Sequence, residues 1–155
     1  MLEAARWAPS SFNEQPWRFI IATRDKPEDF KRLLDCLAPA NQEWAGKVPV
    51  LMLSVASLSF AKNGKPNRHA LHDVGLASAT LALQATDMGL AVHFMAGFDS
   101  DKARDTFAIP EEFEPVAAIA VGHRLVEPTL DSPSARQRRP VDAFAYAGAW
   151  NSAAI

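Results

Sequence analysis

The stretch Pro9-Ser10-Ser11-Phe12-Asn13-Glu14-Gln15-Pro16-Trp17-Arg18-Phe19 joins a polar loop directly to an apolar strand. Two serine hydroxyls and two side-chain amides lie between its prolines, and Pro16 together with the Ser and Asn residues disfavours a helix. Residues 19–22 are apolar. The stretch therefore predicts a loop rich in hydrogen-bonding groups at the lip of a buried strand. Such a loop suits a polar, planar ligand with heteroatoms around its edge.

Outward from this stretch, the sequence predicts alternating strands and helices. Strands are expected over residues 18–23, 48–56, 90–95 and 113–122, and the near-continuous apolar run 48–56 is typical of a central strand covered on both faces. Helices are expected from Pro27, from a cap at Ser100 to Phe107, and over residues 69–88 up to Gly89, with one short turn at 39–44. Residues 2–7 resemble the end of a helix whose beginning is missing.

The helix over residues 69–88 carries apolar side chains nearly all round. A helix of this kind is buried on more than one side, and a second copy of the chain is the simplest partner in a small protein. Beyond Gly122 the chain has no clear periodic pattern, but it carries Phe144, Tyr146 and Trp150. We expect one domain over residues 1–155, in which residues about 123–155 form an extended C-terminal tail that packs on the partner subunit.

Composition excludes several classes of function. The formal net charge of −2 over 155 residues offers no electrostatic basis for binding nucleic acid. The single cysteine, Cys36, cannot form an intramolecular disulfide, so a reducing cytosol is the expected location. No apolar run reaches membrane-spanning length. His69 and His72 lie one helical turn apart, but helix packing explains them better than a metal site, and no metal ligand is predicted.

Further segments, in the same order along the chain, give a more specific indication. They are Asp73-Val74-Gly75-Leu76-Ala77, His93-Phe94-Met95-Ala96-Gly97-Phe98-Asp99, the segment 109–116 and Arg136-Gln137-Arg138-Arg139-Pro140. Together with residues 8–17 they resemble the nitroreductase family of FMN-dependent NAD(P)H oxidoreductases. The resemblance implies an α+β fold, namely a three-layer α/β/α sandwich around a mostly antiparallel central sheet, assembled as a homodimer.

The resemblance also implies a set of cofactor contacts. Pro9, Ser10 and Ser11 are expected to line the flavin, in part across the dimer interface, while Asn13 bonds the ring edge or the N5 region and Gln15 supports the same loop. Met95, Ala96 and Gly97 are expected to offer backbone contacts to the ring, with Gly97 allowing a close approach. Arg136 and Arg138 are expected to meet the FMN phosphate, because a guanidinium group matches phosphate geometry.

The implied activity is hydride transfer from NAD(P)H through the flavin to a nitroaromatic, quinone or similar small-molecule acceptor. This chemistry requires no acid or base from the protein, so no catalytic side chain is predicted. Two alternatives stay open. Family members usually carry a basic segment ahead of the region 2–7, so the chain could be a cofactor-poor or N-terminally truncated nitroreductase-fold dimer without efficient catalysis. It could also be a small α/β protein that binds another planar ligand.

Overall fold

The computed structural model describes residues 1–124 and 137–152. The chain divides into two compact units, Met1–Arg124 and Leu125–Ile155. The first contains all the strands of the described residues. In the second, the described part holds a short 3₁₀ turn at Val141–Ala143 and a contact between the rings of Tyr146 and Trp150. Phe144 and Trp150 are exposed in the single chain, and their packing on a partner subunit stays a prediction.

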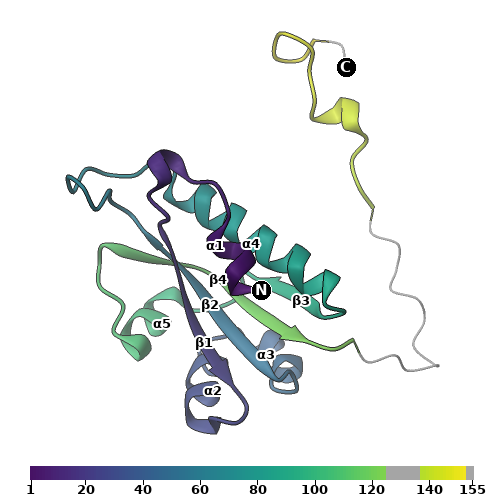
Figure 1. Ribbon diagram of the computed structural model, residues 1–155. Coiled ribbons are helices and arrows are strands. Elements are labelled where there is room, and N and C mark those ends of the chain that lie inside the picture. Colours follow the sequence, from purple (N-terminus) through teal and green to yellow (C-terminus); the bar gives the residue numbers. More distant parts are fainter. Residues whose placement is uncertain (125–136, 153–155) are drawn as a thin grey trace. The chain divides into compact units, whose positions relative to one another are not determined.

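A four-stranded sheet forms the centre of the first unit (Figure 1). Its strands are β1 (Trp17–Thr23), β2 (Val50–Ser57), β3 (Ala91–Met95) and β4 (Phe113–Gly122). They lie in the order β1-β2-β4-β3, and every neighbouring pair is antiparallel. The apolar run that predicted a central strand is β2, which pairs with a neighbour on each side.

Helices cover both faces of the sheet, because alternate residues of each inner strand point to opposite sides. On one face, Met52 and Ile119 pack with α1 (Leu2–Arg6) and α4 (Ala70–Asp87). On the other face, Leu51 and Leu53 pack with α2 (Pro27–Leu34), α3 (Pro39–Ala45) and α5 (Ser100–Phe107). Figure 1 shows these two groups of helices on either side of the strands. The predicted three-layer α/β/α sandwich is confirmed.

Local details differ from the sequence predictions at three places. The side chain of Asp99, not of Ser100, caps α5, since its carboxylate accepts the backbone N–H of Lys102 at 2.9 Å. A carboxylate at this position accepts a hydrogen bond from a free N–H of the first turn, and its negative charge is stabilised by the positive end of the helix dipole. The short turn predicted at 39–44 is the seven-residue helix α3. The loop predicted to be non-helical has non-helical backbone angles at Phe12 (φ 53°, ψ 22°), but it also contains a tight turn at Ser11–Asn13.

Helix α4 buries only part of its apolar surface within one chain. Val74, Ala77, Leu81 and Ala85 are fully buried, whereas Leu71, Leu83 and the C-cap residue Met88 are more than half exposed. The apolar residues outside the core are those expected to meet a second copy, and this contact stays a prediction.

None of the helices within residues 1–124 and 137–152 combines the length and the apolar character needed to cross a bilayer.

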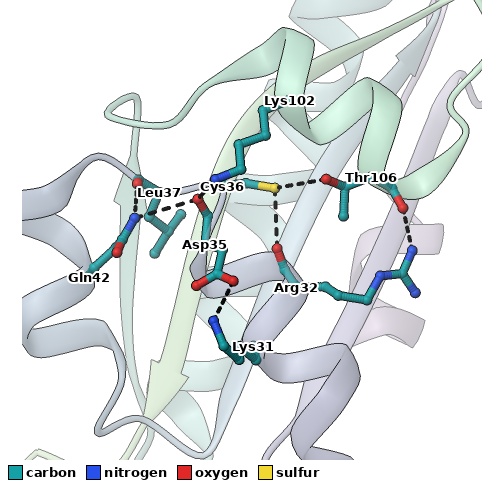
Figure 2. A network of polar contacts seen from close by, with 8 residues as sticks. All are labelled: Lys31, Arg32, Asp35, Cys36, Leu37, Gln42, Lys102 and Thr106. Carbon is teal, nitrogen blue, oxygen red and sulfur yellow. Dashed lines mark hydrogen bonds and ion pairs between the residues drawn. The ribbon is translucent and has the colours of Figure 1, made fainter.

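Figure 2 shows a polar network that joins α2, α3 and α5. The Lys102 ammonium donates to the Asp35 carbonyl at 2.6 Å, and the Gln42 amide donates to the Leu37 carbonyl at the same distance. Cys36 is buried in this network, where its thiol donates to the Arg32 carbonyl. These contacts join α3 and α5 to the residues that follow α2, and so they link the three helices that cover this face of the sheet.

Gly122 at the end of β4 gives a stability test of this packing. A Cβ atom there would lie 2.8 Å from Cδ of Pro49, whose ring cannot rotate away. We expect Gly122→Ala to lower the free energy of unfolding by about 1–3 kcal/mol, measured by urea denaturation. Gly75→Ala is the control, because no atom lies within 4 Å of its added Cβ and alanine favours a helix. Equal stability of the native protein and Gly122→Ala would contradict the close contact.

Candidate functional site

The loop between α1 and β1 has an unusual backbone. Phe12, Asn13 and Gln15 have φ angles of 53°, 55° and 53°, in the left-handed region that favours glycine. Three such non-glycine residues among four are a cluster of backbone strain, and strain of this kind gathers at ligand sites when the surrounding structure enforces it. Nothing in the residue types predicted these angles, apart from the general tolerance of Asn for them.

Long-range and local hydrogen bonds hold the loop in place. The buried carboxylate of Asp73 on α4 accepts the backbone N–H of Ser11 at 2.9 Å, across 62 residues of sequence. The Ser10 hydroxyl accepts the N–H of Gln15 at 3.0 Å, and the Gln15 amide donates to the Asn13 carbonyl at 3.2 Å. The side-chain amide of Asn13 is exposed and makes no hydrogen bond within the described residues. The backbone of the loop is therefore fixed, and the side-chain amide of Asn13 is free to bind a ligand.

Beside the loop lies a hollow of about 360 Å³, here called the serine hollow. Its lining is Pro9, Ser10, Ser11, His69, His72, Asp73 and Leu76. The structure therefore brings together three of the predicted site residues and adds the start of α4, which the sequence reading treated as packing. His72 is two-thirds exposed, and its Nδ1 atom lies 3.0 Å from Oδ1 of Asp73. Within the described residues, no group of three His, Cys, Asp or Glu side chains is placed to hold a metal ion.

The segment after β3 is bound tightly to α3. Met95 is buried, whereas Ala96 and Gly97 are exposed. The Gly97 carbonyl accepts the Ala38 N–H and the Asn41 amide, both at 2.9 Å, and the Ala96 carbonyl accepts the Phe98 N–H at 3.0 Å. The N–H groups of Ala96 and Gly97 have no partner in the part of the chain that the structure describes. A ligand at this segment would therefore find two adjacent backbone N–H donors, whereas the Gly97 carbonyl already accepts two hydrogen bonds.

Asn41 is a site residue that the sequence reading missed. A Cβ atom on Gly97 would lie 2.7 Å from its Nδ2 atom, so the close approach that Gly97 allows in this chain is to Asn41. Trp44, one turn further along α3, meets the ring of His93 edge-on with centroids 5.2 Å apart. The only signal in the sequence was a polar amide and an aromatic residue at helical spacing, which is too common to indicate a site.

The two predicted flavin-lining segments lie on opposite faces of the sheet within one chain. Pro9, Ser10 and Ser11 lie against α4, whereas Met95 packs in the core beneath α2, α3 and α5. One chain therefore does not bring them into a common hollow. Of the predicted phosphate contacts, Arg136 lies outside the described residues, and Arg138, in the second unit, is exposed and donates to the Gln137 carbonyl at 3.1 Å.

A charged cluster stands just ahead of the loop. Hydrogen bonds from Arg6 and then from Trp7 lower the pKa of Glu3 from 4.5 to about 2. The Trp7 indole N–H donates to the Glu3 carboxylate at 2.9 Å, although three-quarters of the Trp7 side chain is exposed. These bonds hold the exposed Trp7 ring against the side chain of Glu3, two residues before Pro9 in the sequence.

The model of the nitroreductase family matches residues 1–123. The chain belongs to the nitroreductase family. YdgI of Bacillus subtilis, provisionally named an NAD(P)H nitroreductase, is 29% identical to it over 94% of this chain and 83% of YdgI. A 15.4 kDa uncharacterised protein of Mycolicibacterium smegmatis is also 29% identical, over 87% of this chain and 98% of that protein.

Two solved structures have a similar fold. A crystal structure described as an oxidoreductase containing FMN is 31% identical, with a TM-score of 0.88 over 97% of this chain and 80% of that one. A nitroreductase in complex with FMN from Exiguobacterium sibiricum has the same fold, with 22% identity and a TM-score of 0.74 over 93% of this chain and 82% of that one. These comparisons confirm the nitroreductase fold that the sequence resemblance implied.

Proposed function

We propose that this nitroreductase-family chain is an FMN-dependent oxidoreductase. It would take reducing equivalents from NAD(P)H and pass them to a small-molecule acceptor such as a nitroaromatic or a quinone. The observation that carries the proposal is the pair of backbone N–H groups of Ala96 and Gly97, which have no partner within the described residues. The Asn41 amide fixes this segment through its hydrogen bond to the Gly97 carbonyl. Family membership and the FMN-containing oxidoreductase of similar fold support the choice of cofactor.

The residues present fit the donor set that a flavin needs. Its ring is apolar on its faces and carries acceptor and donor atoms around one edge, so it requires a few polar groups on otherwise apolar walls. The free amide of Asn13, the hydroxyl of Ser11 and the N–H groups of Ala96 and Gly97 supply the polar groups. Pro9 and the exposed apolar residues of α4 supply apolar surface.

We infer that the site is completed by a homodimer. Pro9, Ser10 and Ser11 lie on the α4 side of the sheet and Gly97 on the α3 side, so a single planar cofactor touched by both segments requires two copies of the chain. Leu71 and Leu83 on α4, and Met88 at its C-cap, are exposed and offer the apolar surface for that association. The aromatic residues of the C-terminal tail would add contact with the partner subunit.

The chemistry that a bound FMN would supply is hydride transfer from NAD(P)H to the acceptor. The chain's own residues would bind and orient. Asn13 would hold the ring edge, with Gln15 fixing the loop behind it. Ser10 and Ser11 would form one wall, Met95, Ala96 and Gly97 the other, and Arg136 and Arg138 would hold the phosphate. No side chain is needed to move a proton in the hydride step. The single cysteine, which is buried, is consistent with a proposed location in the reducing cytosol.

Titration of the purified protein with FMN tests the proposal. We expect flavin fluorescence to be quenched with micromolar or tighter affinity, and the loaded protein to oxidise NAD(P)H when a nitroaromatic acceptor is added. Asn13→Ala should weaken FMN binding roughly ten-fold, because one hydrogen bond to the ring edge is lost. Glu28→Ala is the control, since Glu28 is an exposed polar residue of α2 that belongs to neither proposed wall of the site.

A protein without FMN affinity would overturn the proposal. If it were nevertheless dimeric, the alternative of a cofactor-poor nitroreductase-fold dimer would replace it. A planar ligand other than FMN would be indicated by binding that Asn13→Ala and Arg138→Ala both leave unchanged.

A further inference from the structure

A second hollow is lined by Phe12, the residue that follows Ser11 of the serine hollow in the sequence. It measures about 560 Å³ and is lined by Phe12, Glu14, Phe60, Lys62, Asn63, Lys65 and Pro66. We call it the phenylalanine hollow. Its far wall is the connection between β2 and α4, where Ser59 and Pro66 pair as an isolated antiparallel bridge. Its volume lies within the range of small-molecule sites in proteins.

Phe12 is held out of the core by a strained backbone. Its side chain is 92% exposed, and its φ angle is 53°. The ring meets Phe60 edge-on, with centroids 5.7 Å apart and planes at 84°. Both the exposure of a phenylalanine and its left-handed backbone are unfavourable in the free chain. An aromatic corner kept open in this way is suited to contact with a planar ring.

Hydrogen bonds fix the walls of the phenylalanine hollow. The Glu14 carboxylate accepts the N–H of Ala61 at 2.8 Å and so ties the Phe12 loop to the far wall. Within that wall, the Phe60 N–H donates to the Lys65 carbonyl at 2.9 Å, and the Asn63 side chain accepts the Lys65 N–H at 3.0 Å. The hollow therefore exists before any ligand arrives.

The charges of the lining favour an anion. Lys62 and Lys65 are exposed, and neither ammonium group has a hydrogen-bond or ion-pair partner within residues 1–124 and 137–152. Glu14 is the acidic residue of the lining, and one of its carboxylate oxygens is already bonded to the backbone of Ala61. The two lysines thus leave positive charge at the rim of a hollow whose walls include two phenylalanine rings.

We propose that the phenylalanine hollow binds acidic aromatic compounds. The ring of the ligand packs against Phe12 and Phe60, and its carboxylate meets Lys62 and Lys65. Phe12 lies between Ser11, in the serine hollow, and Asn13, which is proposed to hold the flavin edge. Use of the hollow by an acidic aromatic acceptor rests on the proposed function, whereas binding of the aromatic acid does not require it.

Calorimetric titration of the full chain with para-nitrobenzoate and with its neutral analogue para-nitrobenzamide tests this. The titrations contain no NAD(P)H, and they are run at low ionic strength because exposed charges are screened by salt. We expect the acid to bind roughly five- to ten-fold more tightly than the amide, a preference that the Lys62→Gln/Lys65→Gln double variant removes. Phe12→Ala should weaken both probes, because it removes the ring contact rather than the charge.

Lys47→Gln is the matched control, since Lys47 is exposed and precedes β2 at its opposite end. Circular dichroism verifies that each variant is folded. Equal binding of the two probes to the native protein, or a preference that survives the double variant, would overturn the proposal. Tighter binding of NADP⁺ than of the acid, lost in the same double variant, would also overturn the proposal, because the two lysines would then bind a nucleotide phosphate. A parallel FMN titration separates this outcome from failure of the proposed oxidoreductase.

Discussion

Replacing Asp73 by alanine is expected to lower the free energy of unfolding by about 2–4 kcal/mol and to weaken FMN binding at least ten-fold. Asp73 is buried, and its two carboxylate oxygens have separate partners. One accepts the backbone N–H of Ser11 at 2.9 Å, and the other lies 3.0 Å from the His72 ring. Alanine leaves the Ser11 N–H without a partner and releases the strained loop from α4. Urea denaturation and FMN titration measure the two effects.

Two further variants separate the loop contact from the histidine contact. Asp73→Asn keeps an oxygen for the Ser11 N–H and is expected to cost less than half as much stability as alanine. His72→Ala removes only the exposed partner and should leave the unfolding free energy within about 0.5 kcal/mol of the native value. If Asp73→Ala had native stability and native FMN affinity, the loop would be held by its own hydrogen bonds, and Asp73 would have no role in the site.

The sequence predicted the strands and helices because their signals are local. The apolar run of β2 needs only neighbouring residues to be recognised, and Pro27 marks the start of α2 by its own geometry. The same is true of Gly89, whose positive φ angle of 74° ends α4. Layer arrangement followed from the family resemblance, which also implied the loop at 9–17 as part of a site.

The contacts that build the site are not local, and the sequence did not predict them. Asp73 reaches Ser11 across 62 residues, and Asn41 reaches Gly97 across 56. Such pairs are fixed only when the sheet brings its covering helices to particular loops. The exposed Phe12 was likewise invisible, because its position depends on a backbone angle that its residue type disfavours.

The two segments proposed to line the flavin lie on opposite faces of the sheet, so the proposed site predicts that activity depends on protein concentration. If both segments must meet one cofactor, FMN affinity depends on dimer formation, and dilution of the protein should lower the bound fraction. Burial of the apolar side chains left exposed on α4 would favour this proposed association in water. The proposed site would then be coupled to assembly, although the bonds from the Ser11 N–H to Asp73 and from Asn41 to the Gly97 carbonyl lie within one chain.

Gly97→Ala is expected to weaken FMN binding at least ten-fold while the protein stays folded. The added methyl group would lie 2.7 Å from Nδ2 of Asn41 and displace that amide from the Gly97 carbonyl. Asn41 is a flexible side chain, so the loss of stability should be only about 1 kcal/mol, the value of one hydrogen bond. FMN binding falls further, because the two free N–H groups belong to the segment that shifts.

Two measurements decide this second case. FMN titration gives the affinity, and thermal unfolding of the flavin-free protein gives the stability. Gly75→Ala, on α4 with open space around its added Cβ, is the control for a glycine-to-alanine change and should leave folding intact. Asn41→Ala removes the same hydrogen bond without adding a methyl group at Gly97. If Asn41→Ala weakens FMN as much as Gly97→Ala does, the amide positions the segment; if it leaves FMN affinity unchanged, the methyl group itself blocks the approach. Native FMN affinity in Gly97→Ala would place the flavin elsewhere than at this segment.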